Sequence, residues 1–122
     1  MLTERRDYLL RLIQQAAAAA RRLRELLTGE GVTGDEVASE ADQAIGALLG
    51  GGPQAQLLER VDADTAARLV GDKERLRLWI ELLRIQGEAL RRAGLDAQGE
   101  RVTGRAAALE AAVTRNEESL GT

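Results

Sequence analysis

Apolar residues recur alternately four and three positions apart along the first part of the chain. The positions are Leu9, Ile13, Ala16, Ala20, Leu23 and Leu27. Because an α-helix turns once every 3.6 residues, this spacing places every member of the series on one helical face. Gly29 follows directly and is a typical helix terminator. We therefore expect a long N-terminal helix over residues 1–28 that buries this face against the rest of the protein.

Residues 33–71 are predicted to form shorter helices separated by turn residues. Thr33 and Glu36 have the S/T-x-x-E spacing of a capping box, in which each side chain accepts a hydrogen bond from an otherwise unpaired backbone N–H. Three glycines at 50–52 end this helix, Pro53 suits the first turn of the next one, and Asp62 can cap another. The residues expected to be buried in the first of these helices are Val37, Ala41, Ala44, Ile45 and Leu48. The two short helices carry Leu57 and Leu58, and Ala66, Leu69 and Val70.

Residues 72–120 are predicted to form a helical hairpin. Asp72 and Asp96 are placed to cap its two helices, and Gly94 lies between them, where glycine can adopt the left-handed conformation of a short turn. Gly87 and Gly99 each cost a helix roughly 1 kcal/mol relative to alanine, so we interpret them as points where the two helices touch closely. The expected inward stripes are Leu76, Trp79 or Ile80, Leu83, Gly87 and Leu90, and then Val102, Ala106, Leu109 and Val113.

The small residues of this hairpin, Gly87, Gly94, Gly99 and Ala106, resemble the small-residue pattern of a tetratricopeptide hairpin. One repeat length upstream, the matching glycine position falls on Pro53, so the pattern has no second copy. The large aromatic positions of the motif are occupied here by Leu83, Leu90, Asp96 and Thr103. The resemblance therefore implies a single tetratricopeptide-like hairpin packed against other helices.

The sequence contains no run of alternating β-branched residues, so the expected fold class is all-α, with five or six helices in a single domain over residues 1–122. Aromatic residues make up only 2% of the chain, so the core must be built from Leu, Val, Ile and Ala. Cys and His are both absent. Their absence excludes disulfides and thiol chemistry, and it removes the commonest general base and transition-metal ligand.

The segment "DYLLRLIQQ", residues 7–15, resembles the opening motif of a family of small bacterial helical proteins of unknown function. That motif has Asp-Tyr, then Ile or Leu, an Arg two positions further on, and Ile-Glu-Gln. Asp7, Tyr8, Arg11, Ile13 and Gln15 match it, whereas residue 14 is Gln instead of Glu. The resemblance would cover nearly the whole chain, and it implies a helical architecture without assigning an activity.

Charge is distributed unevenly along the chain. Residues 1–28 carry a balance of +3, residues 29–74 a balance of −7, and residues 75–122 a balance of +1. Either the acidic middle lies against basic helices of this chain or of a second copy, or these charges belong to solvated helix faces. Arginine pairs at 5–6, 21–22 and 91–92 could contact phosphates. The net charge of −3 and the scarcity of aromatic rings argue against a dedicated nucleic-acid binder.

Acidic clusters at residues 35–42 and 62–74 leave open a metal-dependent carboxylate hydrolase of the all-α type, because hard cations prefer carboxylate oxygens. Several of these acids are expected to cap helices, however, and paired E-x-x-E and E-x-x-D elements are lacking. The prediction is therefore no metal and no cofactor, and no small-molecule substrate is identified. The longest uncharged stretch, Gln43 to Leu58, is too short for a membrane span, and with no targeting signal recognised we expect a cytoplasmic protein.

These observations predict a protein–protein interaction or structural module without catalytic activity. Its partner would be another protein or a second copy of the chain in a homodimer. Tyr8 and Trp79 are the only large rings and are candidate interface anchors, although each lies beside an apolar stripe and could equally belong to the core. The residues predicted to bind the partner are Tyr8, Arg11, Gln15 and Trp79. Arginine-mediated nucleic-acid binding and metal-dependent hydrolysis remain the alternatives.

Overall fold

The computed structural model describes the backbone of residues 2–121 and the side chains of residues 4–118. This part of the chain forms six α-helices and contains no β-strand. The helices are α1 (Leu2–Thr28), α2 (Gly34–Leu48), α3 (Gly52–Arg60), α4 (Ala63–Val70), α5 (Lys73–Arg92) and α6 (Asp96–Gly121). The predicted all-α fold with a long N-terminal helix is therefore confirmed. None of the described helices is long and apolar enough to cross a membrane.

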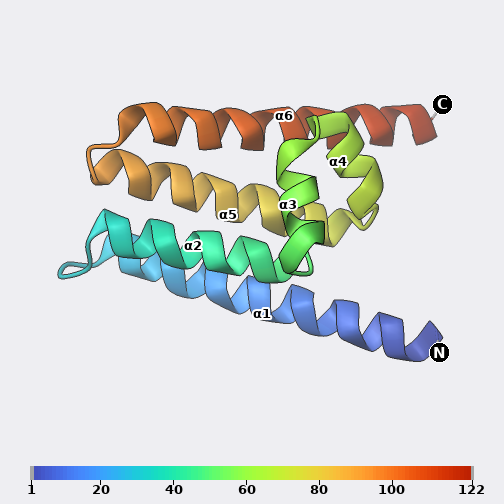
Figure 1. Ribbon diagram of the computed structural model, residues 1–122, viewed down its shortest axis with the longest axis horizontal. Helices are drawn as coiled ribbons and strands as arrows, with labels where there is room; N and C mark the ends of the chain where they lie inside the picture. Colours follow the sequence, from blue (N-terminus) through green and yellow to red (C-terminus); the bar gives the residue numbers. More distant parts are fainter. Residues whose placement is uncertain (1, 122) are drawn as a thin grey trace.

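The four long helices lie side by side in the order α1, α2, α5, α6, and the short helices α3 and α4 lie across α5 near one end, from α2 to α6 (Figure 1). Helix α5 packs against α1, α2 and α6. It therefore carries apolar residues around most of its circumference, as expected of a helix in the centre of a core. Its buried residues are Leu76, Leu78, Trp79, Ile80, Leu82, Leu83, Ile85, Gly87, Ala89 and Leu90.

The apolar seam of α1 faces this core as its spacing predicts. Five of its six residues are buried, and Leu9 is partly buried against the same cluster. The buried residues are Ile13, Ala16, Ala20, Leu23 and Leu27. Towards the beginning of the helix, Tyr8 and Leu10 remain exposed, at 53% and 45% of their full surface. The part of α1 from Ile13 to Leu27 thus contributes one face to the core, whereas the N-terminal part exposes large apolar side chains to solvent.

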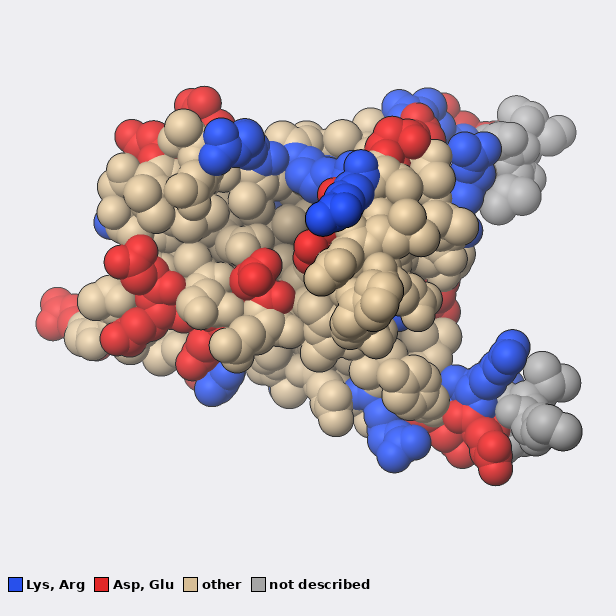
Figure 2. Space-filling model, in the orientation of Figure 1, with Lys and Arg blue, Asp and Glu red and all other residues tan. Residues whose placement is uncertain are grey.

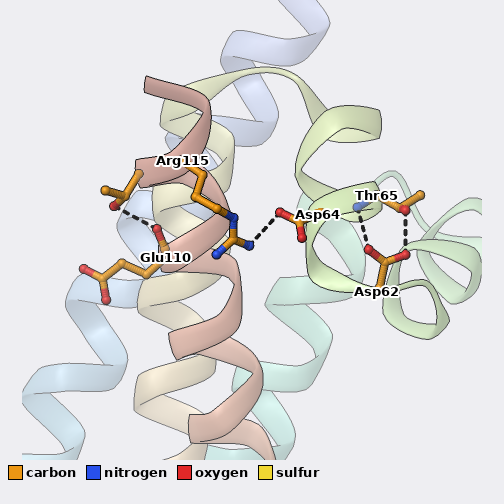
Figure 3. A network of polar contacts seen from close by, with 6 residues as sticks. Asp62, Asp64, Thr65, Glu110 and Arg115 are labelled. Carbon is orange, nitrogen blue, oxygen red and sulfur yellow. Dashed lines mark hydrogen bonds and ion pairs between the residues drawn. The ribbon is translucent and has the colours of Figure 1, made fainter. Parts of the chain in front are cut away.

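Three of the predicted N-caps are present. Thr33 accepts a hydrogen bond from the backbone N–H of Glu36 at 3.3 Å, and Asp72 accepts one from that of Arg75 at 2.9 Å. Asp62 accepts two bonds from Thr65, one from the backbone N–H at 3.1 Å and one from the hydroxyl at 2.6 Å (Figure 3). Each carboxylate or hydroxyl thereby satisfies a backbone donor that has no partner inside its own helix.

The predicted cap at Asp96 is wrong, because Asp96 is the first residue of α6. Gly94 adopts the left-handed conformation with φ of +83°, so that its own N–H bonds to Arg91 and the N–H of Leu95 returns to the carbonyl of Leu90. The N–H of Gly99 then donates to the carbonyl of Leu95. This tight turn starts α6 immediately after Leu95 and leaves no position for Asp96 outside the helix.

The predicted close contact between the hairpin helices is confirmed at Gly87 and Gly99. A Cβ added to Gly99 would lie 2.9 Å from the carbonyl oxygen of Gly87 and 2.8 Å from the Cγ of Arg91. A Cβ added to Gly87 would overlap the hydroxyl of Thr103. Only residues without a side chain allow the two backbones to approach this closely. The likeness of this hairpin to a tetratricopeptide unit stays a prediction.

The short helices bury only part of their apolar side chains. Leu57 on α3 is 53% exposed, and Leu69 on α4 is 58% exposed. The residues that α3 and α4 bury are Ala55, Leu58, Ala66 and Ala67. The reason is that a helix of two or three turns that crosses the bundle contacts it along a narrow line, so only part of its apolar surface is covered. An ion pair of 2.7 Å between Asp64 and Arg115 links α4 to α6 (Figure 3).

Three arginines on α5 and α6 cap the C-terminal ends of the first three helices. Arg75 donates from Nε to the carbonyl oxygen of Leu48 at the end of α2, at 2.8 Å. Arg105 donates from Nη2 to the carbonyl oxygen of Leu58 in the last turn of α3, also at 2.8 Å. Arg92 donates to the carbonyl oxygen of Leu27 at the end of α1. These carbonyls have no partner within their own helices, and the positive charges complement the negative ends of the helix dipoles.

Candidate interaction face on helices α1 and α2

A groove of ≈ 290 Å³ runs between α1 and α2. Its floor consists mainly of alanines, because the run of five alanines at 16–20 makes α1 narrow and α2 carries alanines at matching positions. The lining residues are Leu12, Gln15, Ala16, Ala19 and Arg22 from α1, and Glu40, Gln43, Ala44, Ala47 and Leu48 from α2. Small side chains along both walls leave room for the ridge of another helix to approach the two backbones.

An ion pair closes one end of the groove. Nη2 of Arg22 on α1 lies 3.0 Å from Oε2 of Glu40 on α2, and both side chains are largely exposed. An exposed pair of this kind contributes between about 0 and 1 kcal/mol to stability. Its main effect is therefore to hold two charged side chains across the groove end.

Three of the four residues predicted to bind a partner lie on one strip of α1. Tyr8, Arg11 and Gln15 are all exposed, and Gln15 lines the groove. Because residues four and seven positions apart share a helical face, Tyr8 and Arg11 extend the α1 wall of the groove towards the N-terminus. The chain thus places an exposed tyrosine ring directly beyond an alanine-floored groove.

Trp79, the fourth predicted residue, is not on this strip. It lies on α5 with 1% of its surface exposed, below a separate hollow on another side of the bundle. The alternative that this ring belongs to the core is therefore realised in the structure, whereas Tyr8 is on the surface. The structure brings Tyr8, Arg11 and Gln15 together and leaves Trp79 apart.

The α2 wall of the groove was missed in the sequence. Ala44 and Leu48 were assigned to the buried stripe of α2, but Glu40, Gln43 and Ala47 were not recognised as a second, partly exposed stripe beside it. The signal was present in the spacing of Glu40, Ala44 and Ala47, which recur at four and three positions. What the sequence lacked was any sign that this stripe would lie next to α1.

The two ends of this face differ in charge. Arg5 and Arg11 are balanced by Glu4 and Asp7 towards the N-terminal end of α1, whereas Glu36 and Glu40 outnumber Arg22 at the opposite end. Figure 2 shows acidic side chains gathered over the N-terminal part of α2 and the preceding loop, at the lower left of the view. The face therefore has one end of mixed charge that includes Arg11, one acidic end, and an apolar middle.

The acidic clusters are dispersed among structural roles. Asp62 and Asp72 cap α4 and α5, Asp64 pairs with Arg115, and Glu40 pairs with Arg22. Within residues 4–118, no three acidic side chains come together in an arrangement that could hold a metal ion. The described residues thus offer no geometry in support of the metal-dependent alternative.

In comparisons with protein families, with curated proteins and with solved structures, no match to this chain was found.

Proposed function

We propose that this protein is a non-catalytic structural module that self-associates through the face formed by α1 and α2. The observation that carries the proposal is the alanine-floored groove, with the exposed ring of Tyr8 beside it and an acidic end that carries Glu36 and Glu40. Aromatic anchors next to closely approachable backbone are typical of helix-mediated interfaces. The occupant of the groove is α1 of a second copy of the chain.

Charge complementarity favours a second copy in an antiparallel arrangement. A two-fold axis near the middle of α1 would place the Arg11 end of one copy opposite the Glu36 end of the other, twice per dimer. It would also bring each Tyr8 towards the partner's groove wall, where Leu12 and Ala19 provide apolar surface. A parallel arrangement would instead bring the two acidic ends together and cost free energy.

The test is the molar mass in solution, measured by sedimentation equilibrium or by light scattering coupled to size exclusion. The native chain is expected to be a dimer in the micromolar range. Ala19→Glu places a charge in the groove and is expected to give a monomer, as is Ala47→Glu from the opposite wall. Arg21→Glu is the control, because Arg21 is exposed on α1, does not line the groove and lies off the strip of Tyr8, Arg11 and Gln15.

A monomeric native chain at high micromolar concentration would contradict the proposal, and so would a dimer that survives both groove substitutions. Circular dichroism of each variant verifies that the helices are retained.

The likeness of residues 7–15 to the bacterial family motif, the tetratricopeptide-like character of the hairpin and a cytoplasmic location are parts of the same proposal. The close contact of Gly87 with Gly99 supports the second of these.

A further inference from the structure

A second hollow, of ≈ 320 Å³, lies where α2, α3, α5 and α6 meet. Figure 2 shows this face hollowed beside α3, with acidic side chains on the α2 side and basic side chains on the α6 side. The apolar part of its lining comes from Ile45, Leu83 and Val102. A concave site with an apolar lining and a few convergent polar groups has the general character of a small-molecule site.

The indole of Trp79 lies below this hollow. Its Nε1 is buried and has no hydrogen-bond partner within the described part of the chain. The guanidinium of Arg105 lies over the ring, with its carbon 5.7 Å from the ring centroid, and is anchored by its bond to the carbonyl of Leu58. A buried N–H without an acceptor is uncommon in folded proteins. The Nε1 of Trp79 is one of two buried side-chain polar atoms without a partner among the described residues, and the Oγ1 of Thr103 is the other.

Two carboxylates share one side of the hollow. Asp42 comes from α2 and Glu59 from α3, and neither forms an ion pair among the described residues. Burial raises the pKa of Glu59, the nearby charge of Asp42 raises it further, and Arg105 opposes the shift. Nε2 of Gln86 lies 3.5 Å from Asp42, which is too long for a strong hydrogen bond. Two like charges thus face one hollow, Arg105 offsets only part of the unfavourable environment of Glu59, and a bound ammonium would relieve the remaining repulsion.

The α6 side of the hollow carries two arginines, Arg101 and Arg105. Arg101 is exposed, lines the hollow and forms no ion pair within residues 4–118. Arg105 follows one turn later and is held in place by Leu58 and Trp79. A guanidinium with free donors is well suited to bind a carboxylate. The hollow therefore presents a cation-binding wall and an anion-binding wall on either side of an apolar surface.

We propose that this hollow binds a small zwitterion with an apolar body, the chemical class of a free α-amino acid with an aliphatic side chain. The ammonium group would lie between Asp42 and Glu59, and the carboxylate would face Arg101. The aliphatic chain would contact Ile45, Leu83 and Val102. This inference is independent of the proposed dimer, because none of these residues lines the groove between α1 and α2.

The test uses the fluorescence of Trp79, which is the only tryptophan in the chain and lies directly at the site. The probe is L-leucine, titrated to about 10 mM, with N-acetyl-leucine and 3-methylbutylamine as analogues that lack the cation and the carboxylate, respectively. We expect a saturable change in Trp79 emission with leucine, no saturable change with N-acetyl-leucine, and binding of the amine weakened by about tenfold or more. Absence of a saturable change with leucine overturns the proposal. Equal affinity for the amine and leucine would overturn the assignment of a zwitterion.

Variants distinguish this site from adventitious effects on the tryptophan. Glu59→Gln and Arg101→Gln are expected to weaken leucine binding by about tenfold each, because each removes one charge that contacts the ligand. Glu100→Gln is the matched control, since Glu100 is an exposed neighbour of Arg101 that does not line the hollow. Unchanged affinity in Glu59→Gln and Arg101→Gln, with native circular dichroism, would contradict the assignment of the site.

Discussion

Arg75 donates its Nε–H to the carbonyl oxygen of Leu48 at 2.8 Å, although the two residues are 27 positions apart in sequence. The guanidinium is partly buried, and this burial lowers the pKa of Arg75, with Asp72 acting in the opposite direction. Arg92 and Arg105 bind the C-terminal ends of α1 and α3 in the same manner. In addition to apolar packing, these three hydrogen bonds connect the hairpin of α5 and α6 to α1, α2 and α3.

Replacing Arg75 by methionine should therefore destabilise the fold. Arg75→Met keeps much of the side-chain volume but leaves the carbonyl of Leu48 without its donor, for an expected loss of about 1–3 kcal/mol in the free energy of unfolding. Urea denaturation followed by circular dichroism measures this loss. Arg77→Met, two residues along the same helix, removes only an exposed pair with Glu117 and should change stability by less than about 0.5 kcal/mol. Equal effects of the two substitutions would show that the bond to Leu48 contributes nothing specific.

The contact between Gly87 and Gly99 predicts opposite outcomes for two chemically identical substitutions. Gly99→Ala should destabilise the protein by about 1–3 kcal/mol, because the new Cβ would meet the carbonyl oxygen of Gly87 and the backbones must separate. Gly104→Ala on the same helix meets nothing within 4 Å and should stabilise it by roughly 0.5–1 kcal/mol through helix propensity. Thermal or urea unfolding of both variants tests the pair. Stabilisation by Gly99→Ala would refute the close packing of α5 on α6.

Charge reversal tests the antiparallel arrangement of the dimer more specifically than the substitutions that place a charge in the groove. Arg11→Glu should weaken dimerisation by roughly threefold to tenfold, since an exposed interfacial charge contributes about 1 kcal/mol at most. Adding Glu36→Arg in the same chain should restore the affinity, because the swapped charges again meet across the two-fold axis. Arg6→Glu, on the opposite side of α1, is the control that should leave dimerisation unchanged. Sedimentation equilibrium at low and moderate salt provides the measurement, and failure of the double variant to recover would exclude this arrangement.

The environment of Glu59 predicts how stability depends on pH. Because the pKa of Glu59 is raised in the folded protein, the folded state binds this proton more tightly than the unfolded chain does. The associated stability is fully present below the ordinary glutamate pKa and is lost as pH rises through the raised value. Glu59→Gln should therefore be more stable than the native chain near neutral pH, by less than about 1 kcal/mol because solvent screens the partly exposed group. The difference in the free energy of unfolding between Glu59→Gln and the native chain should vanish in acid. Urea denaturation of both proteins at neutral and at acidic pH measures this difference.

The sequence by itself determined the features that depend on neighbouring residues. Helix starts at Thr33, Asp62 and Asp72 were predictable because an N-cap bonds to a backbone N–H only three positions away. The buried face of α1 followed from the helical period alone, and the close contact of Gly87 with Gly99 followed from the cost of glycine within helices joined by a short turn. The exposure of Leu57 and Leu69 was not predictable, because two or three turns carry too little periodic signal to show which face is buried.

Only the tertiary structure decided what lies across from each helix. The hydrogen bonds from Arg75, Arg92 and Arg105 to distant carbonyl oxygens join residues between 27 and 65 positions apart. The sequence alone does not distinguish an arginine that caps another helix from one that faces solvent. The groove between α1 and α2 and the hollow beside Trp79 have the same origin. Each is made of side chains from separate helices, and local propensity carries no information about which faces meet, because that depends on how the helices pack together as a whole.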